Sequence, residues 1–429
     1  MKVAFLVTGS GGSFYCSNCY RDMLYLRAIK SVPGMEAVAV PLYLPPEKVY
    51  IESGFDTNVF FGAISLYVRE KFHFLEGMPS FFDKILDAPP LLRLAAKSAG
   101  STRTDGLEDL TLNMISSQNS IRNNEIIRLV RYLESIGKPD VIHLSNALII
   151  GLARQIKEHL DVKIVCSLLN EDDWLNEMAE PFRSQAWKMI AEEAQYVDAF
   201  ISPSRYYSEF FVAKAGPSVK NVHVVPSGID LSERMERHRS DSAPAIGFFS
   251  RVSYHNGFDK MADAFIKLKK ERGMEDLTLN VCGGYTSDDK QFINQQIGKI
   301  KKEGFRSFIR IFPGFHGRGK YEFFDSIDVM SVPVRKYDGY GLYILEANAS
   351  GIPVVQPATG AFPEIIGTTK GGILYSVDDV DTLASNLYEL LTDSSRAVSL
   401  GSAGRSMVES KLNNTIMAAN MHSVYSSLK

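Results

Sequence analysis

The stretch DGYGLYILEANASGIPVVQP, residues 338–357, decides the fold of this chain. An acid and two glycines at 338–341 are typical of a loop, and 342–349 follow as a helix that ends before the short β-branched run at 353–357. The apolar run 329–334 before them predicts a buried strand. Strand, loop, helix and strand in this order are the repeating unit of a parallel α/β sheet.

The same alternation of aliphatic runs and helical periods continues on both sides of this stretch. The polar segment 231–244 has no regular apolar repeat and is typical of a linker. Before it, we predict strands at 3–8, 37–42, 141–144, 163–169, 199–202 and 222–225. After it, we predict strands at 245–250, 277–284, 308–314, 329–334 and 353–357, with a helical remainder beyond Pro357.

The sequence therefore predicts two consecutive doubly wound α/β domains. We expect a first domain at 1–240, a second at 241–410 and a final helix at 411–429 that crosses back to the first domain. Residues 45–120 lack clean alternation and are rich in aromatic residues, so we interpret them as an insertion in the first domain.

Composition limits the function. The formal net charge of -3 gives no overall basic field, which disfavours nucleic acid as a partner. The apolar run at 3–7 is too short for a signal peptide, and no apolar segment reaches the roughly 20 residues of a membrane-spanning helix. Four scattered cysteines predict reduced thiols rather than a disulfide framework. We expect a cytoplasmic protein.

Asp338 and Glu346 flank the glycine loop, with Glu346 about two turns into the helix. Carboxylates on both sides of exposed loop amides suit a ligand that carries hydroxyls and phosphate. By spacing alone, the preferred interpretation is that Asp338 caps the helix and Glu346 is solvated.

Two further features are compatible with a phosphate ligand. The glycine turn at 9–13 follows the first strand and leads to a helix, although a plain tight turn is nearly as good an interpretation. Arg251 follows the first strand of the second domain and precedes a helix, where a guanidinium can grip phosphate oxygens. Taken alone, such an arginine is more often a surface residue.

The run from Asp338 to Ile366 resembles the signature of retaining GT-B glycosyltransferases of family four: two acids separated by seven residues, a helix of small residues, a Gly-x-Pro-Val-Val strand and a late acid. Asp338 and Glu346 match the two acids, residues 351–355 the strand and Glu364 the late acid. Weaker agreement covers most of the chain. The resemblance implies two Rossmann-like domains facing a cleft, transfer of a sugar from a nucleotide-diphosphate donor with retention of configuration, and no metal or other cofactor.

The resemblance also implies roles for individual residues. Glu346 is expected to bind the ribose, Asp338 the sugar, and Arg251 with Gly12 the diphosphate, and these acids and Arg251 are the expected catalytic residues. The acceptor, a sugar, a lipid or another small molecule, is expected on the first domain. The remaining expected donor-binding residues are Asn256 at the diphosphate, the backbone of Gly314 and Phe315 near the base, and the amides of Gly339, Tyr340, Gly341 and Leu342 at the sugar.

Three departures from the family pattern motivate an alternative. Asn256 stands where the family has a lysine that grips the diphosphate, Asp338 is one methylene shorter than the usual Glu, and Asn170 replaces the usual His of the first domain. Loss of a preorganised donor costs about 10²-fold or more. The alternative is a degenerate protein of the same fold that binds a nucleotide or glycan without turnover.

The remaining candidates carry weaker signals. Cys16 and Cys19 have CxxC spacing before a helix, but no second CxxC completes a zinc site, so packing is the preferred interpretation. His143, within a buried strand, is interpreted as a hydrogen-bonded core residue. Composition alone raises the hypothesis that the aromatic residues at 60–82 dock weakly on a membrane surface.

Overall fold

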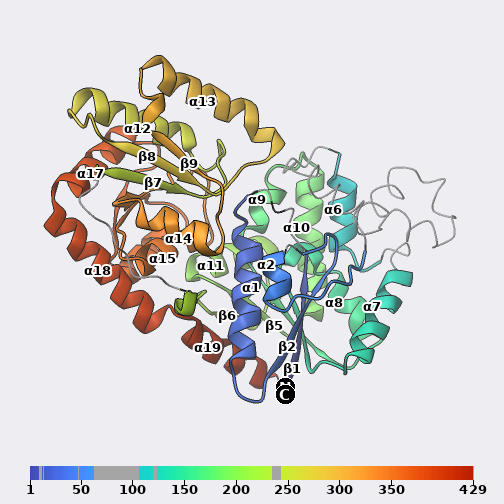
Figure 1. Ribbon diagram of the computed structural model, residues 1–429. Helices are drawn as coiled ribbons and strands as arrows, with labels where there is room; N and C mark the ends of the chain where they lie inside the picture. Colours follow the sequence, from blue (N-terminus) through green and yellow to red (C-terminus); the bar gives the residue numbers. More distant parts are fainter. Residues whose placement is uncertain are drawn as a thin grey trace. The chain divides into compact units, whose positions relative to one another are not determined.

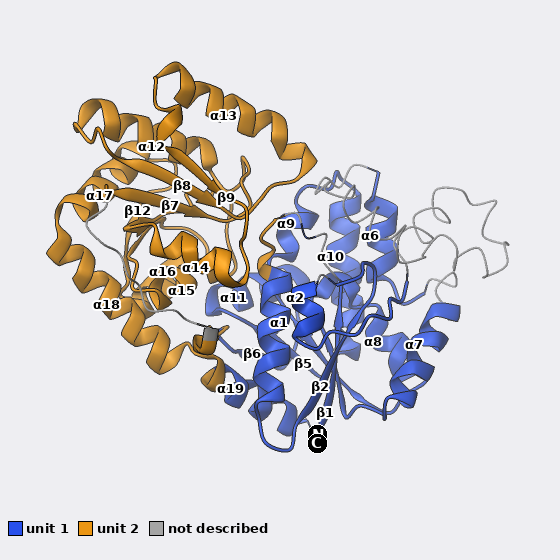
Figure 2. Cartoon of the chain, in the orientation of Figure 1, with its two compact units in different colours: residues 1–12, 18–226, 417–429 blue, residues 13–17, 227–416 orange. Residues whose placement is uncertain are grey.

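The computed structural model describes residues 1–8, 12, 14–46, 48–61, 106–118, 123–233 and 243–428. The chain divides into two compact units (Figure 2). Unit 1 comprises residues 1–12, 18–226 and 417–429, and unit 2 comprises 13–17 and 227–416. The sequence placed the division at 240 and 410; the structure places it after Pro226 and before Met417, and it assigns the short segment 13–17 to unit 2.

Unit 1 is built on a six-stranded parallel sheet of order β2-β1-β3-β4-β5-β6 (Figure 1). Its strands are β1 (Lys2–Val7), β2 (Glu36–Pro41), β3 (Val141–Leu144), β4 (Lys163–Ser167), β5 (Ala199–Ser202) and β6 (Val222–Val224). Its helices are α1 (Ser17–Lys30), α2 (Lys48–Glu52), α6 (Glu108–Ile115), α7 (Asn123–Ser135), α8 (Leu152–Lys157), α9 (Glu171–Leu175), α10 (Phe182–Glu193), α11 (Arg205–Ala215) and α19 (Asn414–Ser426).

Unit 2 has a second parallel sheet, of order β12-β11-β10-β7-β8-β9. Its strands are β7 (Ala245–Phe249), β8 (Thr278–Cys282), β9 (Ile309–Phe312), β10 (Val329–Met330), β11 (Val354–Pro357) and β12 (Gly372–Tyr375). Its helices are α12 (Phe258–Glu271), α13 (Lys290–Lys302), α14 (Gly317–Asp325), α15 (Leu342–Ala349), α16 (Phe362–Thr369), α17 (Val380–Thr392) and α18 (Ser394–Lys411). Figure 1 shows α12 and α13 on one side of this sheet and α14 and α15 on the other.

The predicted strands are confirmed, most of them with ends within two residues of the prediction. They were predictable because strands of a sheet covered on both faces are buried on both faces and form continuous apolar runs. All five residues of β7 are buried, for example. The prediction of an entirely helical chain after Pro357 is wrong, because β12 pairs in parallel with β11.

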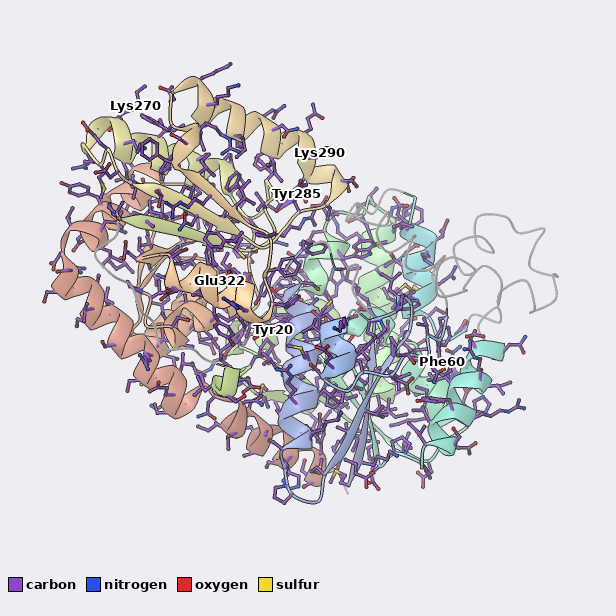
Figure 3. The ribbon with its side chains drawn as sticks, in the orientation of Figure 1. Tyr20, Phe60, Lys270, Tyr285, Lys290 and Glu322 are labelled. Carbon is purple, nitrogen blue, oxygen red and sulfur yellow. The ribbon has the colours of Figure 1, made fainter. Side chains whose placement is uncertain are left out.

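The predicted insertion is described only in part, and its residues 62–105 lie outside the described ranges. Phe60 and Phe61 are each 2% exposed and belong to the hydrophobic core of unit 1. The ring of Phe60 (labelled in Figure 3) packs on Tyr132 of α7, with the two ring centroids 5.2 Å apart. These two rings are therefore not available to a membrane surface, and the other aromatic residues of that hypothesis lie outside the described residues. No helix in the described ranges is long and apolar enough to cross a membrane.

Candidate functional site

The candidate site follows from the strand order of unit 2. Within that sheet the first strand of the unit, β7, lies beside β10, and the chain reverses direction across the sheet at this point. In open α/β sheets, ligands bind outside the carboxyl ends of the strands at such a reversal. Arg251 follows β7, and the loop that begins the quoted stretch follows β10. The two sequence signals therefore flank one switch point.

The loop at 338–341 is held by Asp338 itself. Its Oδ1 accepts hydrogen bonds from the backbone N–H groups of Tyr340 (3.0 Å) and Gly341 (2.9 Å). The structure differs here from the expectation that these amides face a ligand, because both donate to the Asp338 carboxylate. Gly341 has a φ of 73°, in the left-handed region, and a Cβ there would lie 2.6 Å from the ring of Phe362. The interpretation of Asp338 as the cap of the helix is wrong, because the N-cap residue of α15 is Gly341, without a side-chain cap hydrogen bond, and Asp338 instead closes the loop before the helix. The left-handed backbone at Gly341 requires glycine where the helix begins.

The other half of that interpretation, a solvated Glu346, is wrong. Glu346 is 3% exposed, and all eight residues of α15 are buried. Its Oε1 accepts from Nζ of Lys320 on α14 at 2.8 Å, and its Oε2 accepts from the hydroxyl of Tyr15 at 3.0 Å. The Lys320 side chain is itself 6% exposed. This is a buried ion pair, in which mutual attraction and hydrogen bonds offset the loss of hydration.

Cys282, at the end of β8, lies in the field of this pair. Burial, together with the Glu346 charge, raises the pKa of the Cys282 thiol to about 12. Its Sγ donates to the carbonyl of Gly314 at 3.4 Å. Cys282 is therefore a protonated packing residue at neutral pH, as expected for a thiol in a strand.

Arg251 is also paired. Its Nε and Nη2 donate to the two oxygens of Asp289 at 2.8 and 3.0 Å, and Nη2 also donates to the Thr286 hydroxyl at 3.0 Å. The side chain is 16% exposed. Nη1 has no hydrogen-bond partner among the described residues. One edge of the guanidinium is thus fixed by a carboxylate, which leaves the Nη1 nitrogen to serve an anion.

Asn256 contributes to the same loop. Its Nδ2 donates to the backbone carbonyl of Arg251 at 2.8 Å and to the Ser250 hydroxyl at 3.1 Å. The amide thus braces the turn between β7 and α12, instead of supplying the cation that the family pattern has there.

The other predicted donor-binding residues are divided between the two units. Gly314 and Gly319 face each other so closely that a Cβ on Gly319 would lie 2.9 Å from Cα of Gly314, and Phe315 beside them is 8% exposed. Gly339 and Leu342 flank the Asp338 turn, and both are buried. Gly12 has a φ of 70° and belongs to unit 1. The structure therefore brings Asp338, Glu346 and Arg251 onto one edge of the unit 2 sheet and leaves Gly12 in the other unit.

Unit 1 carries its own buried polar cluster at the carboxyl ends of its strands. Arg21 is fully buried and donates to the Asp22 carboxylate and to the carbonyl of Ser145, which follows β3. Burial raises the pKa of Asp22 to about 6 against the opposing effect of Arg21. Glu171, 1% exposed, accepts from the backbone N–H groups of Ala147 and Leu169, each at 3.0 Å.

His143 is a core residue, as its place in a strand predicted. Its ring nitrogens lie 2.6 Å from the Tyr425 hydroxyl and 2.7 Å from the Ser167 hydroxyl. Burial, with a smaller contribution from Arg21, lowers the pKa of His143 to about 3. The imidazole is therefore neutral at physiological pH and is shielded from solvent. Asn170, where the family has its histidine, has a φ of 58° at the start of α9, a conformation that asparagine tolerates well.

The two CxxC thiols, Cys16 and Cys19, are partly exposed, and Cys166 and Cys282 are buried. In the described part of the chain, no cluster of three or more His, Cys, Asp and Glu residues is arranged to hold a metal ion.

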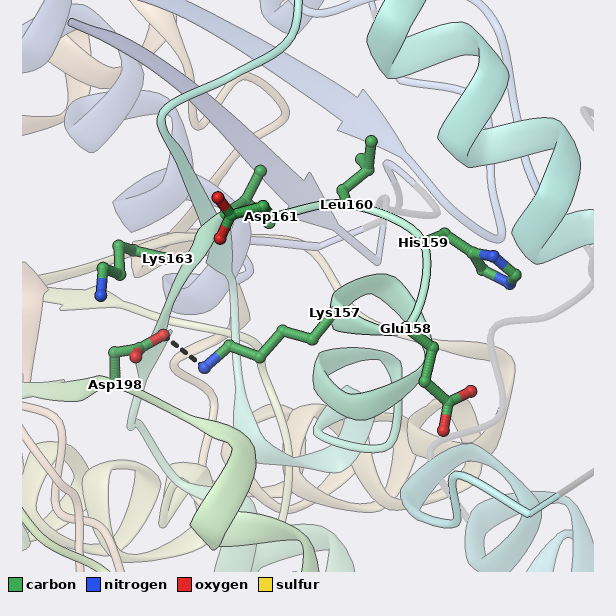
Figure 4. A pocket seen from close by; sticks show the side chains of 8 residues that line it. Lys157, Glu158, His159, Leu160, Asp161, Lys163 and Asp198 are labelled. Carbon is green, nitrogen blue, oxygen red and sulfur yellow. Dashed lines mark ion pairs between the residues drawn. The ribbon is translucent and has the colours of Figure 1, made fainter.

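A surface hollow of about 400 Å³ opens elsewhere on unit 1 (Figure 4). It is lined by residues 157–163 and Asp198, and Lys157 forms an ion pair with Asp198 at 2.7 Å. Lys163 begins β4 and Asp198 precedes β5, so the hollow lies at the amino ends of these strands. This is the edge opposite to the one where doubly wound sheets bind ligands.

Sequence reasoning missed three residues of the candidate site: Lys320, Tyr15 and Asp289. Each forms its contact with a residue at least 26 positions away, so no local spacing marks it. Lys320 lies in a polar segment where a loop leads into a helix, and such a composition is typical of a protein surface. Tyr15 lies beside the glycine turn, of which only the glycines were considered as ligand-binding candidates.

The chain matches two families of known proteins. The pattern described as "Glycosyl transferases group 1" matches residues 243–393, and the pattern described as "Glycosyltransferase Family 4" matches residues 111–233. The first match contains every predicted site residue of unit 2, and the interval between the two matches, residues 234–242, lies close to the division of the units after Pro226.

Curated relatives and solved structures agree with these matches. The chain is 27% identical over 271 residues to the GDP-mannose-dependent monoacylated alpha-(1-6)-phosphatidylinositol monomannoside mannosyltransferase of Corynebacterium glutamicum, which covers 58% of this chain and 66% of the relative. It is 29% identical over 244 residues to the GDP-mannose-dependent alpha-(1-6)-phosphatidylinositol monomannoside mannosyltransferase of Mycolicibacterium smegmatis, over 52% of this chain and 60% of the relative. The alignments thus span less than two thirds of the length of these relatives.

Among solved structures, the sucrose-phosphate synthase of Thermosynechococcus elongatus superposes with a TM-score of 0.72 at 15% identity, over 100% of this chain and 99% of that one. HepE of Anabaena, in complex with UDP and glucose, superposes with a TM-score of 0.71 at 13% identity over 100% of both chains. At these identities the likeness establishes the fold.

Proposed function

Because the chain belongs to the family-four, group 1 glycosyltransferases and has the GT-B fold, we propose that it transfers a sugar from a nucleotide-diphosphate donor to an acceptor, with retention of anomeric configuration. The acceptor is a sugar, a lipid or another small molecule that binds mainly to the first domain. The proposal includes neither a metal nor nucleic acid. Relatives named for GDP-mannose and a structural neighbour bound to UDP make GDP-mannose and UDP-glucose the first donors to test.

One observation carries the proposal. Asp338 and Glu346, the two acids of the family signature, lie on the loop and helix that follow β10, and Arg251 follows β7, at the switch point of the unit 2 sheet. Glu346 is a buried carboxylate, and its burial costs desolvation free energy that a surface acid does not lose. A buried, hydrogen-bonding acid at the nucleotide edge of a Rossmann-like sheet is suited to ribose hydroxyls.

The proposed chemistry is leaving-group departure from a positioned donor. The bond between the anomeric carbon and the phosphate oxygen breaks, the acceptor oxygen bonds to that carbon on the face that the phosphate leaves, and the acceptor proton passes to the leaving phosphate. Arg251, oriented by Asp289, donates a hydrogen bond from Nη1 to the phosphate oxygen on which negative charge develops, and Asp338 holds the sugar. Rate enhancement then comes from positioning and electrostatic stabilisation rather than from a side-chain nucleophile.

A donor panel tests the proposal. UDP, GDP, ADP and TDP sugars would be assayed for thermal stabilisation and for slow sugar release, with the wild type, Glu346→Gln and the control Glu322→Gln. Glu322 (labelled in Figure 3) is an exposed acid of α14, and among the described residues it pairs only with its helix neighbour Arg318, at 2.9 Å. Saturation at a hundred times the dissociation constant stabilises a protein by about 2.7 kcal/mol.

A donor that stabilises and is turned over by the wild type and Glu322→Gln, but not by Glu346→Gln, supports the proposal. Stabilisation without turnover in every protein would favour the binding-only alternative. No stabilisation by any nucleotide sugar would contradict both.

A further inference from the structure

The segment Phe14–Ser17 precedes the bulk of α1 in sequence, yet the structure groups it with unit 2. Phe14 forms an antiparallel bridge with Gly284, and the backbone N–H of Tyr15 donates to the carbonyl of Gly283 at 2.7 Å. Gly283 and Gly284 directly follow β8. The segment is thus bonded to the carboxyl end of the strand next to β7, where a nucleotide binds in sheets of this order.

Tyr15 reaches from there to the candidate ribose carboxylate. The side chain is 3% exposed and packs on Phe249, the last residue of β7, with ring centroids 4.8 Å apart. Its hydroxyl donates to Oε2 of Glu346 at 3.0 Å, while Lys320 donates to Oε1. Each carboxylate oxygen therefore already has a donor.

Phe14, the adjacent residue, contacts the other candidate donor-binding group. The guanidinium carbon of Arg251 lies 5.2 Å from the centroid of the Phe14 ring. A cation at this distance from an aromatic ring is held by a favourable electrostatic contact. Two consecutive residues thus contact Glu346 and Arg251, the two groups assigned above to the ribose and the diphosphate.

We propose that Phe14 and Tyr15 form a resident cover of the donor site, which a nucleotide displaces in order to bind. The Tyr15 hydroxyl holds the place on Glu346 that a ribose hydroxyl takes, and the Phe14 ring lies beside the guanidinium that a phosphate contacts. This inference rests on the proposed function, because it requires a donor at these groups. The apparent affinity for donor is then the affinity of the open form multiplied by the fraction of molecules in which the cover is open.

The two residues make separable predictions. Tyr15→Phe removes only the hydroxyl and keeps the ring on Phe249, so it frees Glu346 for any ligand with a ribose. Phe14→Leu removes the ring over Arg251 and keeps an apolar side chain, so it helps only ligands with a diphosphate. Tyr375→Phe is the matched control, because the Tyr375 hydroxyl is buried, has no hydrogen-bond partner in the described part of the chain and belongs to the edge strand β12.

Dissociation constants of UDP, GDP, uridine and guanosine would be measured by titration of the full chain, with ligand-observed NMR for the weak nucleosides. For the nucleotide that the wild type binds, we expect Tyr15→Phe to tighten both diphosphate and nucleoside by about tenfold, the scale of one hydrogen bond to a charged group. Phe14→Leu should tighten the diphosphate alone, and Tyr375→Phe should change neither.

Equal or weaker nucleotide binding by Tyr15→Phe would overturn the cover and leave the proposed function standing. If no nucleotide binds to the wild type or to any variant, both the cover and the proposed function fail. Thermal unfolding of each variant comes first, and if Tyr15→Phe does not fold, the selective effect of Phe14→Leu on diphosphates decides.

Discussion

The buried ion pair between Lys320 and Glu346 gives the sharpest test of the structural argument. Their side chains are 6% and 3% exposed, and the Lys320 Nζ to Glu346 Oε1 distance is 2.8 Å. Lys320→Met removes the charge and keeps a long, flexible side chain. Glu346 would then retain the Tyr15 hydroxyl as its one hydrogen-bond donor among the described residues.

The expected loss of stability is large, because an unpaired carboxylate stays buried. Removal of one partner of a buried pair costs about 3–5 kcal/mol, whereas replacing both charges by neutral groups is often nearly neutral. Lys320→Met/Glu346→Gln should therefore recover most of the loss. The matched surface control is Lys270→Met. Lys270 (labelled in Figure 3) pairs with Glu303 at 2.6 Å, but the two side chains are 53% and 35% exposed, so its loss should cost under about 1 kcal/mol.

Equilibrium urea unfolding of the full chain measures these differences. With a slope of about 3 kcal/mol per molar urea for the transition that reports unit 2, Lys320→Met should lower its midpoint by roughly 1 M or more. The reasoning is refuted if Lys320→Met behaves like Lys270→Met, or if the double variant is no more stable than Lys320→Met alone.

Four further predictions follow from single contacts. Because the folded pKa of His143 is lowered to about 3, only the unfolded chain takes up its proton as pH falls, so between pH 7 and 5 the wild type should lose about 2 kcal/mol more stability than H143Q in urea unfolding. D338A should cost about 1–2 kcal/mol, because two backbone N–H groups of the loop lose their acceptor, whereas D338N keeps the acceptor and should mainly lower donor turnover; equal stability losses would show that these two hydrogen bonds do not hold the loop. G341A should cost at least about 2 kcal/mol, since its added Cβ would lie 2.6 Å from a ring, while G367A, in open space on a helix, should be neutral or stabilising in thermal melts. N256K should tighten the binding of UDP or GDP about tenfold without changing the affinity for nucleosides; an unchanged affinity for UDP and GDP would show that residue 256 does not contact the diphosphate.

The fold was predictable wherever burial leaves a mark on the sequence. Parallel strands covered on both faces are apolar throughout, so β7, whose five residues are all buried, was found by composition alone. β12 was missed because its four residues, GILY, begin at the second of two glycines and lie among helices, and only pairing with β11 identifies them. α15 has no solvent-exposed face, since all eight of its residues are buried, so it lacks the polar stripe of a surface helix. It was predicted as a helix because a glycine loop precedes its mostly apolar run.

The site was predictable to the extent that it is local. The spacing of Asp338 and Glu346 is a property of one loop and one helix, and the structure keeps both on that loop and helix. The partners of Glu346 are tertiary: Lys320 comes from the preceding helix, and Tyr15 from 331 residues away. Whether an acid is solvated or buried depends on such partners, which is why spacing favoured the wrong description of Glu346.

The charges of the candidate site have a common arrangement that bears on the proposed donor. Arg251 is matched by Asp289, and Lys320 by Glu346, so these two cations are each compensated before a ligand arrives. A diphosphate would then be held by directed hydrogen bonds from a guanidinium in a fixed orientation more than by net positive charge. In such a site an added cation at Asn256 strengthens binding of the ground-state diphosphate, but catalysis gains only where the new charge acts more strongly on the departing phosphate than on the bound donor.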